Sequence, residues 1–196
     1  EDVNDYAKVE IADPSICPRY TARAVKNVKI GPSPQWIQRR LTACGLRSIN
    51  NIVDITNYIM LEYGQPMHAY DLDNIEGKKI IVRDASDGET LETLDEQPRE
   101  LKSGMITIAD EKRAIGVAGV MGGANTEVTD TTTTVLFESA NFNPILVRRG
   151  AKSLGMRTDA SALFEKGLDS ENCLNAINRA CELIEEMGAG EVIGGC

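Results

Sequence analysis

A glycine-rich stretch and the apolar run after it contain the residues most suggestive of chemistry. Glycines stand at positions 116, 119, 122 and 123, and the run Val135–Ala140 that follows carries one carboxylate, Glu138. Glycine allows a ligand to approach the backbone closely. An acid with apolar residues on both sides is expected to be partly shielded from water. The stretch therefore predicts a small-molecule pocket beside Glu138. The alternative is a bulged strand whose Glu138 points to solvent.

The only histidine of the chain, His68, is a second candidate for chemistry. A Ser-His or Cys-His nucleophile system would have to use it, because the base must be an imidazole within hydrogen-bond reach. Ser139 and Ser161 are the serines that this hypothesis would pair with His68, although the chain contains no G-x-S-x-G elbow. A lone histidine is more often a structural hydrogen-bonding residue.

Other common site chemistries lack their sequence signatures. No Gly-Lys-Ser/Thr follows the glycines, as a Walker A loop requires, and their spacing does not form G-x-G-x-x-G. The five cysteines are scattered without a CxxC pair, so neither a zinc site nor a disulfide framework is indicated. We therefore expect no metal and no cofactor in this chain, and reduced cysteines, as in a cytoplasmic protein.

Two more segments offer polar side chains. Thr56 and Asn57 fall late on a predicted helix, and they matter only if the end of that helix faces the glycines. The segment MRTDAS at 156–161 is typical of a capping turn. It also fits a binding loop in which small residues line a pocket and Arg157 offers a charge.

The densest basic patch of the chain consists of Arg148, Arg149, Lys152 and Arg157. It fits a solvated helix face, and it is also the one plausible place for a phosphate backbone. The chain as a whole is acidic, with 21 Lys and Arg against 30 Asp and Glu and a net charge of -9. Because phosphate neutralisation supplies most nucleic-acid affinity, we expect this chain alone to bind RNA poorly.

Periodicity and turn signals place these residues on an α+β framework. Strands followed by helices, without regular βαβ alternation, favour this class. The capping and stop signals predict helices at about 34–45, 48–61, 144–155, 159–166 and 170–187. Alternation predicts strands at about 20–30, 79–83, 90–94, 106–109, 114–120 and 135–140, and a loop at 67–71.

The bulk properties fit a folded protein outside the membrane. A chain of 196 residues with 42% hydrophobic residues can bury a sizeable core. No apolar run approaches the roughly 20 residues that span a bilayer. The acidic first residues do not resemble a signal peptide. The chain begins with Glu1 rather than Met, so we expect 1–196 to be a fragment of a longer polypeptide.

Four blocks of the sequence, taken in order, resemble one family. DITNYIMLEYGQPMHAYD, GVAGVMGG, VLFESANFNP and GMRTDASALFEKGLD are similar to the editing module of the bacterial-type phenylalanyl-tRNA synthetase beta subunit. The resemblance extends from RYTARAV to the final helix. It implies a single compact α+β module, a β-sandwich of unusual topology with flanking helices.

The resemblance also implies a function. The family's editing module hydrolyses the ester of tyrosine mischarged onto tRNA(Phe). The implied partners are the 3′ end of that tRNA, the remaining beta-subunit domains and the alpha subunit. ATP and Mg belong to aminoacylation in the full enzyme, and no aminoacylation site is found in this fragment. The alternative is a non-catalytic tRNA-binding or scaffold module of the synthetase.

Eight positions match the family's pocket: Thr56, Asn57, His68, Gly122, Gly123, Glu138, Thr158 and Ala160. A mostly apolar synthetic pocket rejects an added hydroxyl poorly, so a second site that favours the hydroxyl is needed. We expect Glu138 to accept a hydrogen bond from the phenol. His68, Thr56 and Asn57 are expected to orient a water molecule and the polar end of the substrate. The two glycines would give space and N–H donors, and a small Ala160 would keep the pocket open.

Overall fold

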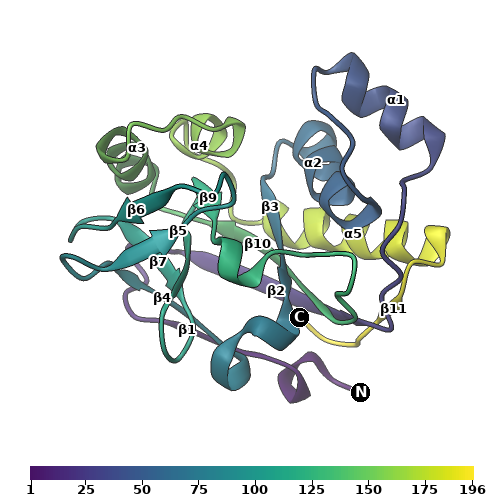
Figure 1. The fold of residues 1–196 in the computed structure, drawn as a ribbon, viewed down its shortest axis with the longest axis horizontal. Helices are drawn as coiled ribbons and strands as arrows, with labels where there is room; N and C mark the ends of the chain where they lie inside the picture. The colour runs from purple at the N-terminus through teal and green to yellow at the C-terminus, as the bar shows by residue number, and fades with distance from the viewer.

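Two β-sheets face each other, and helices cover the outer face of one of them (Figure 1). A computed structural model describes all residues, 1–196. The first sheet has the order β1 (Lys8–Ile11), β4 (Lys79–Asp84), β7 (Ile106–Ala109), β8 (Ala114–Val117) and β9 (Met121–Gly122). The second sheet has the order β11 (Glu191–Val192), β2 (Arg19–Lys26), β10 (Val135–Asn141) and β3 (Met67–Asp71). A separate hairpin pairs β5 (Thr90–Glu92) with β6 (Pro98–Glu100).

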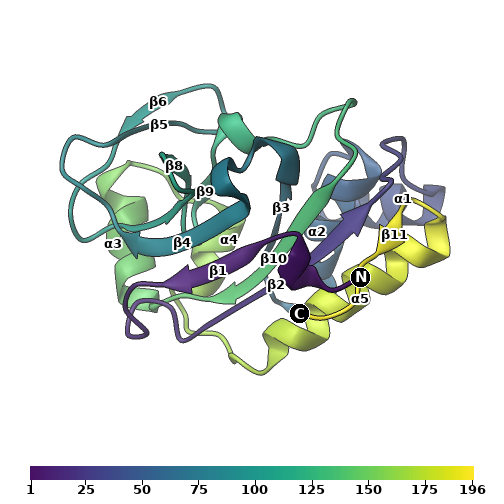
Figure 2. The ribbon, with the colours of Figure 1, turned by 90° about the horizontal axis from the view of Figure 1, so that it is seen from below.

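The helices form two groups. One group shares a core with the second sheet: α2 (Asn51–Tyr63) and α5 (Asn172–Met187) pack on the strands, and α1 (Gln35–Ala43) packs on α2. Figure 2 shows α5 running beside β2 and β10. The other group contributes to the core between the sheets: α3 (Pro144–Ser153) and α4 (Asp159–Phe164). No helix combines the length and the apolar character that a membrane crossing needs.

The strand β10 separates the two hydrophobic cores, and all seven of its residues are buried. Successive side chains of a strand point to opposite faces. Leu136 and Ala140 accordingly belong to the core between the sheets, whereas Val135 and Phe137 belong to the core beneath the helices. Glu138 shares its face with Leu136 and Ala140, so its carboxylate is directed between the two sheets.

The expected α+β sandwich with flanking helices is confirmed, and all five predicted helices are present. The start of the second helix was predicted wrongly. Its cap is Asn50, whose side chain accepts a hydrogen bond from the Val53 N–H, and not Ser48. Ser48 Oγ instead donates to the fully buried carboxylate of Asp54, as does Ser33 Oγ. The side chain of Asp54 thus accepts a hydrogen bond from a hydroxyl that the local sequence pattern assigned to a helix end.

The prediction of a loop at 67–71 is wrong, because these residues form β3. The segment MHAYD contains no run of β-branched residues, and its strand conformation comes from pairing with β10. In this register His68 lies opposite Glu138, and Tyr70 lies opposite Leu136. The strand β1 was also missed, and it too is defined by a distant partner, since it pairs in parallel with β4.

Candidate functional site

A cavity lies between the sheets, where β3, β8, β9 and β10 meet α4. Its walls are mostly apolar, and they include His68, Gly122, Glu138 and Ala160. The cavity has a volume of about 70 Å³. This is room for several water molecules, since each needs about 10–15 Å³. Glu138 is only 8% exposed, so its side chain does not point to bulk solvent. The expected pocket beside a shielded acid is present.

The carboxylate of Glu138 is held by two tyrosines of the neighbouring strands. The Tyr20 hydroxyl donates to Glu138 Oε2 at 2.5 Å, and the Tyr70 hydroxyl donates to the same oxygen at 2.6 Å. Tyr20 pairs with Ala140 across the ladder, and Tyr70 pairs with Leu136. The two phenols therefore reach the carboxylate from opposite directions along β10.

The other carboxylate oxygen, Glu138 Oε1, accepts no hydrogen bond from the chain. It is also absent from the buried polar atoms that lack a partner, so it keeps access to the cavity. Burial raises the pKa of Glu138, and the hydrogen bonds from Tyr20 and Tyr70 oppose that rise. Burial, followed by the Glu138 charge, holds the pKa of both phenols well above the usual range, so they remain donors.

His68 lies against Gly122 at the wall of the cavity. A Cβ atom at Gly122 would come within 2.4 Å of His68 Cε1 and 2.6 Å of Nε2, so only glycine leaves room for this ring. The ring packs edge-on against Tyr70 with centroids 4.4 Å apart. Burial lowers the pKa of His68 to about 4, and Nε2 is buried without a hydrogen-bond partner. The imidazole is therefore neutral at physiological pH.

The Ser-His nucleophile hypothesis finds no support in the geometry. Ser139 lies on the opposite face of β10 from Glu138, and its buried hydroxyl has no partner. The Ser161 hydroxyl donates to the Thr158 carbonyl inside a capping box. Neither serine hydrogen-bonds His68, so the base that such a system requires is missing.

Thr158 and Gly123 support the walls without lining the cavity. Thr158 caps α4, and its hydroxyl donates to the Val120 carbonyl at 2.9 Å. This bond ties α4 to the glycine-rich turn, residues 116–123. The Gly123 N–H donates to the Ile115 carbonyl at 2.8 Å. The Gly123 N–H is therefore already paired in this conformation, and its part as a donor to an ester oxygen stays a prediction. Ala160, by contrast, does line the cavity.

Thr56 and Asn57 are not brought to the cavity wall. Thr56 is buried in α2, and its hydroxyl donates to the Val53 carbonyl one turn earlier at 2.7 Å. Asn57 is half-buried on the same helix. Their part in orienting water stays a prediction.

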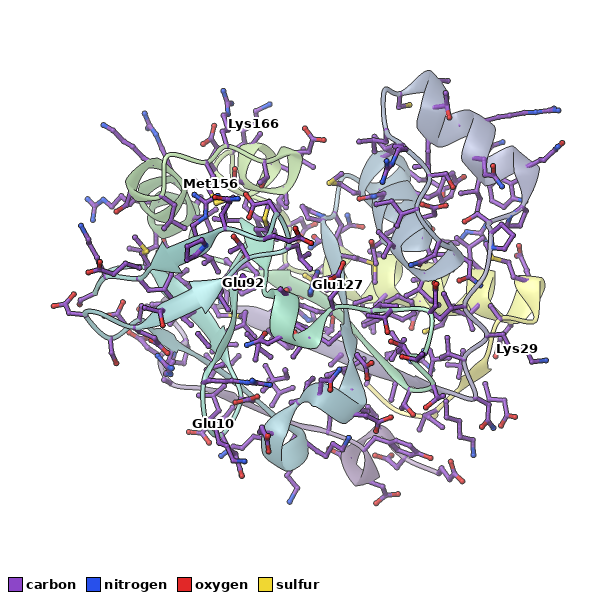
Figure 3. The ribbon with its side chains drawn as sticks, viewed as in Figure 1. Glu10, Lys29, Glu92, Glu127, Met156 and Lys166 are labelled. Atoms are coloured by element: carbon purple, nitrogen blue, oxygen red, sulfur yellow. The ribbon has the colours of Figure 1, made fainter.

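The basic patch is assembled over α3 and α4, outside the cavity. Arg148, Arg149, Lys152 and Arg157 line two adjoining surface hollows that share Glu165. Arg157 Nη2 lies 3.0 Å from Glu165 Oε1, and its side chain is 70% exposed. Met156 and Lys166, which lie on either side of α4 in the chain, mark this side of the molecule in Figure 3.

Comparison with known proteins decides the family. A family model described as "B3/4 domain" matches residues 16–189. The chain belongs to the B3/4 domain family.

Curated relatives of this B3/4 domain are phenylalanine–tRNA ligase beta subunits. That of Geobacter sulfurreducens is 51% identical over 195 residues, which are 100% of this chain and 24% of the relative. That of Carboxydothermus hydrogenoformans is 53% identical over 186 residues, which are 95% of this chain and 23% of the relative. The chain thus matches a region of that subunit and spans about a quarter of its length.

A solved structure shares the fold of this B3/4 domain. It is an N-terminal fragment of the phenylalanyl-tRNA synthetase beta subunit from Pyrococcus horikoshii, with a TM-score of 0.63 and 13% sequence identity. The match covers 95% of this chain and 50% of that one. At this identity the likeness concerns the fold alone.

Sequence reasoning missed Tyr20 and Tyr70, the two residues that bind the acid at the site. Each lies two positions along its strand from the residue paired with Glu138, which is Ala22 on β2 and His68 on β3. The alternation His68-x-Tyr70 was the available signal, because residues two apart in a strand share a face. That signal is invisible when 67–71 is taken as a loop.

The neutral state of His68 gives a direct prediction. We expect the ring signals of this chain's single histidine to titrate near pH 4 in the folded protein, against about 6.5 in the unfolded chain. Between these values the unfolded chain binds more protons, so His68 makes the free energy of unfolding fall as the pH drops from 6.5 toward 4. An NMR pH titration measures this, and a folded-state midpoint at or above 6.5 would contradict the burial of the ring.

Proposed function

We propose that this chain is the post-transfer editing domain of a phenylalanine–tRNA ligase beta subunit. In this proposal it hydrolyses the ester of tyrosine mischarged onto tRNA(Phe). The observation that carries the proposal is the buried carboxylate of Glu138, which presents one unpaired oxygen to a mostly apolar cavity. The identity to beta subunits along the whole chain supports the same assignment.

The unpaired oxygen supplies the selectivity. The hydroxyl of a tyrosine in the cavity would donate a hydrogen bond to Glu138 Oε1. A phenylalanine would displace water from that oxygen without offering a hydrogen bond in its place. An unsatisfied buried acceptor costs about 1–3 kcal/mol, and every 1.4 kcal/mol or so is a tenfold preference. Tyr20 and Tyr70 keep Oε2 satisfied with either substrate. The discrimination therefore arises at one oxygen and not at the whole carboxylate.

The hydrolysis itself asks little of the protein, because an aminoacyl ester is already activated. In this proposal the neutral His68 orients a water molecule at the cavity wall, and Gly122 leaves the space that the ring needs. A lowered pKa makes His68 a weak proton acceptor at neutral pH, which favours an orienting role over general-base catalysis. The small side chain of Ala160 leaves the cavity open, and the hydrogen bond from Thr158 to the Val120 carbonyl holds α4 in place.

The basic hollows over α3 and α4 are proposed to bind the phosphates of the single-stranded tRNA 3′ end. Helix α4 separates the two features, with Ala160 and Phe164 toward the cavity and Glu165 toward the hollows. The amino acid could then enter the cavity while the backbone lies on the cationic surface. Because the chain carries a net charge of -9, most of the affinity for tRNA would come from the rest of the synthetase, including the alpha subunit.

Replacing the carboxylate tests the proposal. In the full-length enzyme, Glu138→Gln keeps the shape of the side chain and removes its charge. We expect the ratio of kcat/KM for Tyr-tRNA(Phe) over Phe-tRNA(Phe) to fall roughly five- to a hundredfold or more, the equivalent of about 1–3 kcal/mol. The matched control is Glu89→Gln, which removes a carboxylate paired with Arg83 away from the cavity. An unchanged ratio in Glu138→Gln would remove the residue from recognition, and a wild-type enzyme that releases no tyrosine would favour the scaffold alternative.

The hollows give a separate prediction. The double variant Arg148→Ala, Arg149→Ala should raise KM for Tyr-tRNA(Phe) and leave the Tyr over Phe preference unchanged. The plot of log affinity against log salt should become shallower by about 0.7 for each phosphate that the variant no longer neutralises. Lys29→Ala is the control, since Lys29 is an exposed cation on the opposite side of the molecule from Met156 and Lys166 in Figure 3. Unchanged affinity and salt slope would show that the patch is only a solvated helix face.

A further inference from the structure

We propose that Tyr20, assisted by Tyr70, is a positioning residue that fixes Glu138 so that Oε1 alone is presented to the substrate. The inference rests on the proposed function and adds a specificity determinant to it. The substrate phenol would then be the third phenol on one carboxylate, and the only one bound at Oε1.

The need for positioning follows from the side chain itself. The terminal torsion of glutamate is broad and roughly twofold, so an unrestrained carboxylate can rotate out of the orientation in which an unpaired oxygen faces the cavity. Two donors at 2.5 and 2.6 Å on the same oxygen, reaching it from opposite directions along β10, restrict that rotation. Hydrogen bonds to a charged acceptor are about twice as strong as neutral ones. The two tyrosines thus fix the carboxylate in the orientation that leaves Oε1 facing the cavity.

Tyr20 and Tyr70 differ in their access to a ligand. Tyr70 lines the cavity together with His68, so its ring can touch a substrate directly. Tyr20 is not part of the cavity lining, and its hydroxyl reaches the site only through Glu138. The hydroxyl of Tyr20 is therefore the one group whose removal tests positioning without changing the surface that the substrate meets.

The two phenols are also the only groups that stabilise the charge of Glu138. The titratable groups that face it are Tyr20 from β2, Tyr70 and His68 from β3, and Cys17 from the segment before β2. His68 is neutral, and burial raises the pKa of the Cys17 thiol to about 12. The glycine-rich turn and α4 bring no titratable side chain to the cavity. Loss of one phenol therefore raises the pKa of Glu138 further.

The experiment is a pH profile of hydrolysis by the full-length enzyme carrying Tyr20→Phe. We expect kcat/KM for Tyr-tRNA(Phe) over Phe-tRNA(Phe) to fall roughly tenfold at acidic pH, the equivalent of about 1.4 kcal/mol. The preference should recover as the pH rises, because the variant needs a higher pH to ionise Glu138. The acid limb of the preference should thus move to higher pH, and the rate for the Phe ester should change little.

A matched control is available in the same chain. The Tyr6 hydroxyl donates to the exposed carboxylate of Glu1 at 2.5 Å, so Tyr6→Phe breaks the same kind of bond away from the cavity. This variant should keep the wild-type profile. If Tyr20→Phe does not fold, Tyr70→Phe provides the second test and should move the acid limb in the same direction.

The outcomes separate the inference from the function beneath it. A wild-type enzyme with no preference for the tyrosyl ester would overturn the proposed function. A selective wild-type enzyme whose profile is unchanged by Tyr20→Phe and by Tyr70→Phe would overturn the positioning role alone. An equal loss for both esters at every pH would also overturn it, because that pattern marks a purely structural defect.

Discussion

A carboxylate held between two packed sheets is the constraint on which the rest of this structure depends. Transfer of an ionised carboxylate into an apolar surrounding is very costly unless hydrogen bonds compensate. Glu138 meets this condition through two phenols on the strands on either side of it. Only one of its oxygens is satisfied in this way. The structure therefore maintains, at the wall of a cavity, an acceptor that a suitable hydroxyl can complete.

The rest of the fold holds Glu138 and the residues around it in place. β10 is the shared boundary of both hydrophobic cores, so the backbone that carries Glu138 is fixed from two sides. β3 places His68 directly opposite the acid, and Gly122 gives the ring its space. Thr158 ties α4, with Ala160, to the glycine-rich turn. Residues that are far apart in the sequence thus meet around a single side chain.

The sequence predicted those parts of the site that depend on local chemistry. The apolar neighbours of Glu138 indicated its burial, and the Asn143-Pro144 pair marked the start of α3 correctly. The strand at 67–71 could not be predicted in this way, because its conformation comes from pairing with a strand more than sixty residues away in the chain, as the His68–Glu138 register shows. Tyr70 was missed for the same reason, and Tyr20 was missed because the register between β2 and β10, which brings it to Glu138, is not a local property of the sequence. The direction in which the Thr56 side chain points depends on how α2 packs in the fold. Helical periodicity in the sequence does not determine that packing.

The central claim is that Glu138 Oε1 recognises a phenol oxygen. The most direct measurement is a crystal structure of the full-length enzyme with tyrosine bound. The account predicts the tyrosine ring in the cavity beside Gly122 and Ala160, with its hydroxyl in hydrogen-bond contact with Oε1. Tyr20 and Tyr70 should stay on Oε2. A cavity that stays free of tyrosine at saturating concentration, or tyrosine bound in the cavity with its hydroxyl turned away from Glu138, would contradict the account.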